Sequence, residues 1–275
     1  PERIKAGESF TLPAIGGQNT NVYIMASDYI RDIGDLRALA VDSANGTMSV
    51  GGKRLQRLKL GDVDASSVTS TLSKLTITSC PSLTVIDARN VTGLVETIDL
   101  TKCPRIEEAY FGGTAVTGVI VPSGSKIAKL QLGDQTTSIT LVKLPRLTSS
   151  GFLYGDLSKV EFLRVENVGF DEFEILRELY NLDGSSLRDI RIMGVNTSGT
   201  AEDIDMLANL YNDLDKDGNP HPYNGIDDKD NAVESLAPIV EGTLRIPSAV
   251  YEDTYETVSN YFKNLNIIVS GGRYV

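Results

Sequence analysis

The sequence is poor in the residues on which many enzymes and metalloproteins depend. It contains one histidine and two cysteines in 275 residues, and it lacks a zinc-binding histidine pair, a phosphate-binding loop and a dinucleotide-binding glycine motif. Catalysis by a histidine-activated nucleophile would depend on His221 alone, which lies between two prolines. We therefore expect no enzymatic activity. With only two cysteines, stability does not rest on disulfides.

Long apolar runs and positive charge are also scarce. No stretch approaches the roughly 18 consecutive apolar residues of a membrane-spanning helix, so we expect no membrane insertion. Acidic residues outnumber basic ones by 37 to 26, which gives a formal net charge of −11. This balance argues against a nucleic-acid partner, because phosphate binding needs a basic surface. The chain begins at Pro1 without a methionine or a signal peptide, and we expect it to be a fragment or a processed product.

The sequence does contain a repeat. Between Leu83 and Leu132 the pattern apolar-x-x-apolar-x-apolar begins at residues 83, 95, 106, 116 and 127. Two such triplets make one coil of 23 or 21 residues, a period typical of solenoid proteins. The last two apolar residues of a triplet are two positions apart, so each triplet predicts a short strand with both side chains pointing inward.

The triplets define a predicted core, and two cysteines occur beside it. The core residues are Leu83, Ile86, Ala88, Val95, Ile98, Leu100, Ile106, Ala109, Phe111, Val116, Val119, Val121, Ile127, Leu130 and Leu132. Cys80 and Cys103 occupy equivalent places 23 residues apart, and each precedes a proline. We interpret them as small buried residues of adjacent coils. A disulfide or a metal pair is the alternative.

The ends of the chain differ from this regular middle. Residues 1–50 are not repeat-like and are expected to form an N-terminal cap or a short lead-in module. Residues 51–200 are expected to form the solenoid, and residues 201–275 a C-terminal helical coil, an acidic loop and a cap.

Apolar residues at helical spacing predict a helix over residues 249–264 near the C-terminus and two helices directly after the regular coils. One covers residues 171–182 and the other residues 201–214, with Asp171 and Thr200 as the N-cap residues. The expected fold is therefore an α/β leucine-rich-repeat solenoid. It has short strands, an irregular convex side, and helical coils toward the C-terminus.

The repeat also resembles a known family. The segment "CPSLTVIDARNVTGLVETIDLTKCPRIEEAYFGGTAVTGV" resembles the leucine-rich repeats of gut Bacteroidetes surface proteins. It is similar above all to the repeat region of large virion proteins of gut bacteriophages and prophages. The closing segment "GTLRIPSAVYEDTYETVSNYFKNLNIIVSGGRYV" resembles the end of those regions, and together the similar parts cover about residues 33–275.

The outward strand positions are the candidate binding residues. If the triplets that begin at 83, 106 and 127 share one sheet, then Asp87, Tyr110 and Gln131 form an exposed column on it. Arg164 and Arg191 are expected to continue this column. Mixed aromatic, amide and charged side chains on a rigid sheet suit the recognition of a protein or a glycan. An ordinary solvated sheet face is the alternative for each residue.

A second candidate site lies in an acidic segment. Residues 201–234 contain ten acidic residues and two lysines, a net charge of −8. Within them Asp213, Asp215 and Asp217 stand at positions 1, 3 and 5 of a calcium-loop pattern, and a glycine follows at position 6. Position 12 is Asn224 rather than the usual glutamate. The segment is therefore either a calcium site or a solvated acidic turn, and no other cofactor is expected.

These observations and the resemblance lead to two functional hypotheses. The first is a structural or recognition module of a phage virion protein, in a tail or a fibre, that contacts a host surface or other virion subunits. The second is an adhesin of the bacterial cell surface that binds a protein or a glycan. The expected location is the phage particle in the first case and the cell surface in the second.

Overall fold

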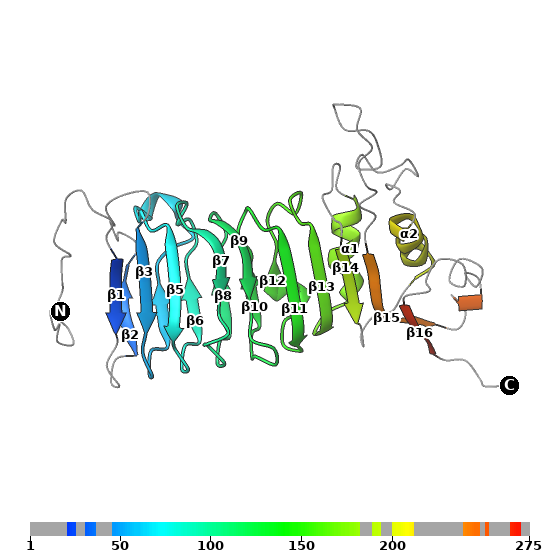
Figure 1. The fold of residues 1–275 in the computed structure, drawn as a ribbon, viewed down its shortest axis with the longest axis horizontal. Coiled ribbons are helices and arrows are strands. Elements are labelled where there is room, and N and C mark those ends of the chain that lie inside the picture. Colours follow the sequence, from blue (N-terminus) through cyan, green and yellow to red (C-terminus); the bar gives the residue numbers. More distant parts are fainter. Residues whose placement is uncertain are drawn as a thin grey trace, which may run out of the picture. The chain divides into compact units, whose positions relative to one another are not determined.

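Short parallel strands make up most of the fold, which is a parallel β-solenoid with few helices (Figure 1). The computed structural model describes residues 21–25, 31–36, 46–181, 189–193, 200–211, 239–247, 251–252 and 265–270. Contacts within the chain divide it into two units, Pro1–Gln135 and Thr136–Val275. The expected divisions at residues 50 and 200 stay a prediction.

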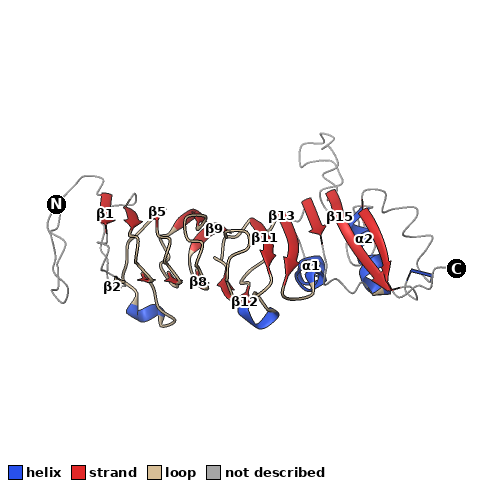
Figure 2. Ribbon diagram, turned by 90° about the horizontal axis from the view of Figure 1, so that it is seen from below, coloured by secondary structure: helices blue, strands red, loops and turns tan. Residues whose placement is uncertain are grey.

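The first unit has two layers of parallel strands, which Figure 2 shows edge on. One layer contains β1 (Asn21–Met25), β3 (Thr47–Gly51), β5 (Lys74–Ser79), β7 (Val95–Asp99) and β9 (Ala115–Ile120). The other contains β2 (Asp32–Asp35), β4 (Arg57–Lys59), β6 (Val85–Asp87), β8 (Glu108–Tyr110) and β10 (Lys129–Gln131). A short 3₁₀ helix, η1 (Ala65–Ser67), follows β4.

The second layer corrects the expectation of an irregular convex side. Successive triplets are half a coil apart, so they fall alternately on the two sides of the coil. The triplets that begin at 83, 106 and 127 supply β6, β8 and β10, while those that begin at 95 and 116 supply β7 and β9. Both sides therefore form ladders of strands in this unit.

The core lies between the two layers and consists largely of the predicted residues. Ile86, Ala109 and Leu130 are each fully buried in the middle of their strands. Val95 is an exception, because 41% of its surface is exposed while its neighbour Leu94 is fully buried. Glu96 has a positive φ of 69°, which interrupts the alternation of inward and outward side chains along β7. The pairing with β9 shifts at the same place, because β9 contains one more residue there, Thr117.

The two cysteines are buried and unbridged, as the first interpretation of the sequence predicted. Burial raises the pKa of the Cys80 thiol. Burial, with the nearby Cys80, also raises the pKa of Cys103 to about 12. Both groups therefore stay protonated at neutral pH and behave as small apolar residues.

The second unit combines parallel strands with helices. Its strands β11, β13, β14, β15 and β16 pair in this order. The strands are β11 (Ser138–Leu144), β12 (Phe152–Leu153), β13 (Phe162–Val168), β14 (Asp189–Met193), β15 (Ile239–Pro247) and β16 (Leu265–Ser270). The helices are η2 (Ser149–Gly151), α1 (Glu172–Asn181) and α2 (Ala201–Tyr211).

Helices α1 and α2 lie where the sequence predicted them, and their caps are as expected. Asp171 Oδ1 accepts a hydrogen bond from the backbone N–H of Phe173 at 3.1 Å. Thr200 Oγ1 accepts one from the backbone N–H of Asp203 at 3.2 Å. These bonds satisfy N–H groups that have no partner within the helix. None of the helices in the described part of the chain is long and apolar enough to cross a membrane.

Candidate recognition surface

The predicted column exists in the first unit, on the outer side of β4, β6, β8 and β10, but Asp87, Tyr110 and Gln131 are half-buried rather than exposed. Strand pairing places Asp87 opposite Tyr110, and Tyr110 opposite Gln131. Lys59 on β4 pairs with Asp87 and extends the column by one strand. We call the outward side chains of these four strands, with the residues that follow each strand, the β4–β10 face.

A second column runs beside the first on the same face. Its members are Arg57, Val85, Glu108 and Lys129, which pair across the four strands. The residue between the two columns on each strand points inward and is at most 1% exposed, namely Leu58, Ile86, Ala109 and Leu130. This alternation follows from the two-residue period of a strand, so the buried core fixes which side chains face out.

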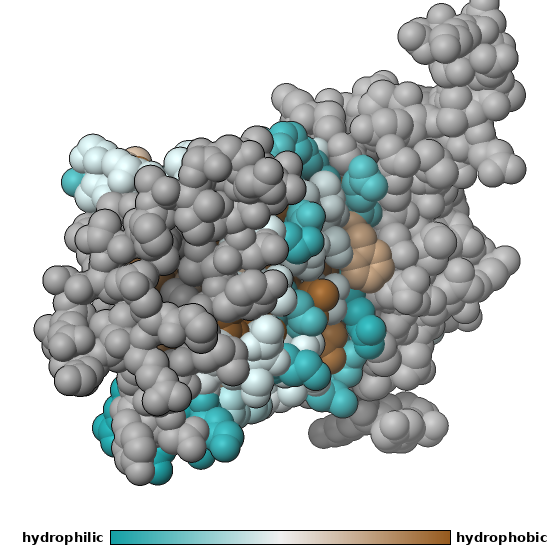
Figure 3. Space-filling model, turned by 60° about the vertical axis from the view of Figure 1, so that its left-hand side comes forward, coloured by the Kyte–Doolittle hydropathy of each residue, from teal (hydrophilic) through white to brown (hydrophobic). Residues whose placement is uncertain are grey.

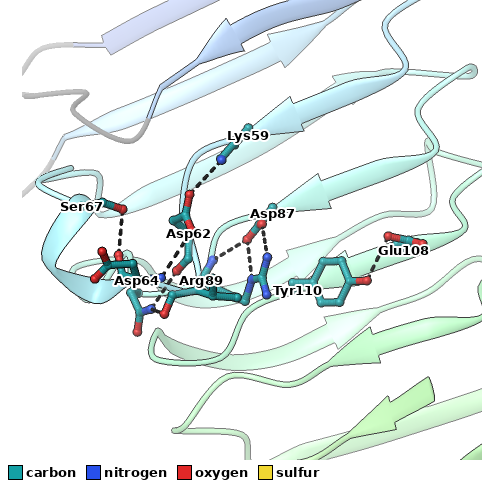
Figure 4. Close-up of polar contacts among 10 residues, drawn as sticks. Lys59, Asp62, Asp64, Ser67, Asp87, Arg89, Glu108 and Tyr110 are labelled. Carbon is teal, nitrogen blue, oxygen red and sulfur yellow. Dashed lines mark hydrogen bonds and ion pairs between the residues drawn. The ribbon is translucent and has the colours of Figure 1, made fainter. Parts of the chain in front are cut away.

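Arg89 connects two of the predicted residues (Figure 4). Its Nε donates a hydrogen bond to Asp87 Oδ1 at 2.9 Å, and Nη2 donates to Oδ2 of the same carboxylate. The guanidinium also lies 4.7 Å from the centre of the Tyr110 ring. A planar guanidinium suits both contacts, because it can bind a carboxylate with two bonds and stack on an aromatic ring. These contacts fix Asp87, Arg89 and the tyrosine relative to one another.

Tyr110 is held from the other column as well. Its hydroxyl donates to Glu108 Oε2 at 2.9 Å, and Lys129 Nζ lies 3.1 Å from the other carboxylate oxygen. Burial would raise the pKa of Glu108, but the bonds from Lys129 and Tyr110 outweigh it and lower the pKa. Burial and the bond to Glu108 raise the pKa of Tyr110. Tyr110 is therefore a neutral phenol beside an ionised carboxylate at neutral pH.

The chain turns tightly after these strands, which lets side chains cross the face. A Cβ added at Gly112 would lie 2.3 Å from Gln131 Nε2, so the Gln131 side chain lies against the glycine. Gly113 has a φ of 72°, and a Cβ there would lie 2.2 Å from Asn90 Oδ1. Asn90 itself has a φ of 61°, and its Nδ2 donates to the Asp62 carbonyl at 2.8 Å. The turns are thus tied to neighbouring coils.

Charged groups on this face are paired with close neighbours. Lys59 Nζ binds Asp62 Oδ2 at 2.8 Å, and Arg89 binds Asp87 (Figure 4). Lys129 forms a third pair, with Glu108. Neither Glu108 nor Lys59 is among the binding residues predicted from the sequence. The spacing of two residues between Glu108 and Tyr110 was the signal that could have placed both on one face.

Arg164 and Arg191 do not continue the column. They pair with each other on β13 and β14, and their further partners are Thr140 on β11 and Glu241 on β15. These strands belong to a different sheet from β4, β6, β8 and β10. The expectation failed because the coils lengthen and the register blurs between Leu132 and Val160, so sequence spacing no longer identifies the side. Arg164 Nη2 binds Glu166 Oε2 at 3.1 Å on its own strand.

The predicted calcium ligands Asp213, Asp215 and Asp217 lie outside the described residues. Within the ranges that the structure describes, no group of three or more histidine, cysteine or acidic residues could hold a metal ion. The calcium hypothesis therefore stays a prediction.

Comparison with known proteins gives no further identification. A scan against protein-family models, a search of curated proteins and a search of solved structures each returned no match.

Proposed function

We propose that the chain is a non-enzymatic structural and recognition module of a phage virion protein, in a tail or a fibre. The observation that carries this proposal is the in-register polar column of the β4–β10 face. Its side chains are held by a buried core beneath and by ion pairs beside them, and such preorganisation reduces the entropy lost when a partner binds. The virion assignment rests on the resemblance of the repeat and of the closing segment.

The leucine-rich-repeat type is part of this proposal. The period of 21 to 23 residues and the inward apolar triplets support it. In the second unit, β13, α1, β14 and α2 follow one another, and this alternation supports helical coils toward the C-terminus. Leucine-rich repeats combine one strand with a helix or a 3₁₀ turn in each repeat.

A recognition role suits the β4–β10 face better than catalysis. A glycosidase needs two carboxylates that face each other across a scissile bond, one of them protonated. Here Asp87 is bound by Arg89, and Glu108 by Lys129 and Tyr110. The bonds from Lys129 and Tyr110 lower the pKa of Glu108, so this carboxylate is not prepared to donate a proton. The partner that we propose is a host-surface protein or glycan, or another virion subunit.

Immunogold electron microscopy tests the assignment to a virion. Antibodies against the purified chain are expected to label the tails or fibres of particles produced by the bacterium that carries the gene. Antibodies that have been absorbed with the chain provide the control. Label on intact bacterial cells and none on particles would contradict the proposal and favour the cell-surface adhesin.

A further inference from the structure

The β4–β10 face combines several charged groups with little net charge. Its cations are Arg57, Lys59, Arg89 and Lys129, and its anions are Asp62, Asp87, Glu108 and Asp134. Three of the four cations form ion pairs with these anions at hydrogen-bond distance. The whole chain, in contrast, carries a charge of −11. Opposite charges a few ångströms apart cancel one another's field at longer distances, so this face does not attract ions of either sign strongly.

The same groups offer many hydrogen-bond donors and acceptors. An ionised carboxylate has about four acceptor sites and an ammonium has three donors. Arg89 already donates three hydrogen bonds to Asp87, so the more exposed Lys59, Glu108 and Lys129 offer most of the remaining capacity. Gln131 adds an amide, which carries both donors and an acceptor. Ligands with many neutral hydroxyl groups match such a mixture, since each hydroxyl both donates and accepts.

Tyr110 supplies an apolar element in the middle of this polar face. It is partly exposed, and its orientation is fixed by Arg89 at the ring and by Glu108 at the hydroxyl. Rigid aromatic residues contribute contact area at a low cost in conformational entropy. Exposed large apolar residues elsewhere in the described part of the chain are Val63, Val95, Ile120 and Leu153. Figure 3 accordingly shows, on the side that it presents, mostly hydrophilic described surface with small hydrophobic areas.

The columns repeat at the spacing of neighbouring strands, which is roughly 4.8 Å. This spacing is close to the length of one sugar unit in an extended polysaccharide. A chain of sugars that crosses the strands would therefore meet Lys59, Asp87, Tyr110 and Gln131 with successive units. A single extended peptide rises about 3.3 Å per residue and does not match this repeat.

We propose that the β4–β10 face binds an uncharged polysaccharide that runs across the strands along the column from Lys59 to Gln131. This inference rests on the recognition role proposed above and specifies the class of ligand. Because the face is locally neutral, affinity comes from hydrogen bonds and from contact with the Tyr110 ring. Ionic strength therefore has little effect on it.

Isothermal titration calorimetry tests this inference by measuring the Kd of uncharged oligosaccharides of six sugar units. The oligosaccharides are those of cellulose, mannan, xylan and β-1,3-glucan. We expect at least one of them to bind, with less than about a twofold change in Kd between about 50 and 500 mM salt. Tyr110→Ala and Gln131→Ala should each weaken binding by about tenfold or more. Thr97→Ala, at an exposed position on β7 in the other layer, is the matched control and should leave Kd unchanged.

Three results would overturn the inference. The first is the failure of all four uncharged oligosaccharides to bind at millimolar concentration. The second is binding that Thr97→Ala weakens as much as Tyr110→Ala does. Polygalacturonate and chitosan are the charged probes, and binding of these alone, with steep salt dependence, would also reject it. Labelled virion tails together with any of these results would reject the ligand class and leave the proposed function standing.

Discussion

Replacing Phe111 by alanine is expected to lower the free energy of unfolding by about 3–5 kcal/mol. Phe111 is among the largest fully buried side chains of the described residues, and it lies where β8 ends. Its backbone N–H binds the Gln131 carbonyl at 3.0 Å, so the backbone at this position is held against the next coil. Truncation would leave a cavity between the layers that this backbone cannot close, and chemical denaturation would measure the loss.

Two variants provide controls for Phe111→Ala. Phe111→Leu keeps most of the buried volume and should cost less than half as much. Val63→Ala removes an apolar side chain that is 68% exposed and should change stability by less than about 0.5 kcal/mol. A loss below about 1 kcal/mol for Phe111→Ala would contradict the placement of this ring in the core.

Replacing Arg177 by methionine is expected to destabilise the second unit by about 2–3 kcal/mol. Arg177 in α1 binds both carboxylate oxygens of Asp203 in α2, at 2.6 and 2.8 Å, and it also binds the α1 cap Asp171 at 3.0 Å. Asp203 is buried, so the substitution leaves a buried carboxylate without its cation. The Arg177 side chain is 37% exposed, and solvent reduces the expected loss relative to a fully buried pair.

The pH dependence of the loss distinguishes this ion pair from simple packing. Burial raises the pKa of Asp203, but Arg177 and Thr200 outweigh it, so the folded-state pKa lies below the ordinary value. The pair therefore stabilises the fold above about pH 4, where the unfolded carboxyl is ionised. This contribution disappears as the pH falls through the lower folded-state pKa. Thermal melts should show the difference between wild type and Arg177→Met shrinking between about pH 6 and 3.

Arg164→Met is the matched control for this experiment. Arg164 is similarly exposed, at 40%, and it binds Glu166 on its own strand. An exposed pair of this kind contributes less than about 1 kcal/mol, so its removal should have a small effect. Two results would contradict a stabilising ion pair between Arg177 in α1 and Asp203 in α2. One is an equal loss of stability for the two variants, and the other is a loss for Arg177→Met that does not depend on pH.

The sequence predicted the regular middle of the fold well, because a single physical rule governs it. Alternating inward and outward residues recur wherever a strand covers a core. The register of Asp87, Tyr110 and Gln131 follows because each lies between the last two apolar residues of its triplet. The helix caps Asp171 and Thr200 were also predictable, since they depend on residues only two or three positions away. Local chemistry and a fixed period were sufficient for these features.

Other features depend on information that the pattern does not contain. The positive φ of Glu96 interrupts the alternation of β7 beside the exposed Val95, and a glutamate gives no sign of this conformation in the sequence. Arg164 and Arg191 lie in another sheet than predicted. The spacing of the triplets changes after Leu132, so it no longer indicates on which side of the coil a residue lies. The stacking of Arg89 on Tyr110 joins residues 21 positions apart, and only the pairing of β6 with β8 brings them together.

The most direct test of the account is the register of the β4–β10 face, on which both proposals depend. Pyrene labels attached through Tyr110→Cys and Gln131→Cys, with Cys80→Ala and Cys103→Ala as background, should give strong excimer fluorescence. These positions are paired on adjacent strands, roughly 4.8 Å apart. Labels at Tyr110→Cys and Thr97→Cys, on opposite layers of the first unit, should give monomer emission alone. Excimer emission from the second pair, and none from the first, would contradict the solenoid register.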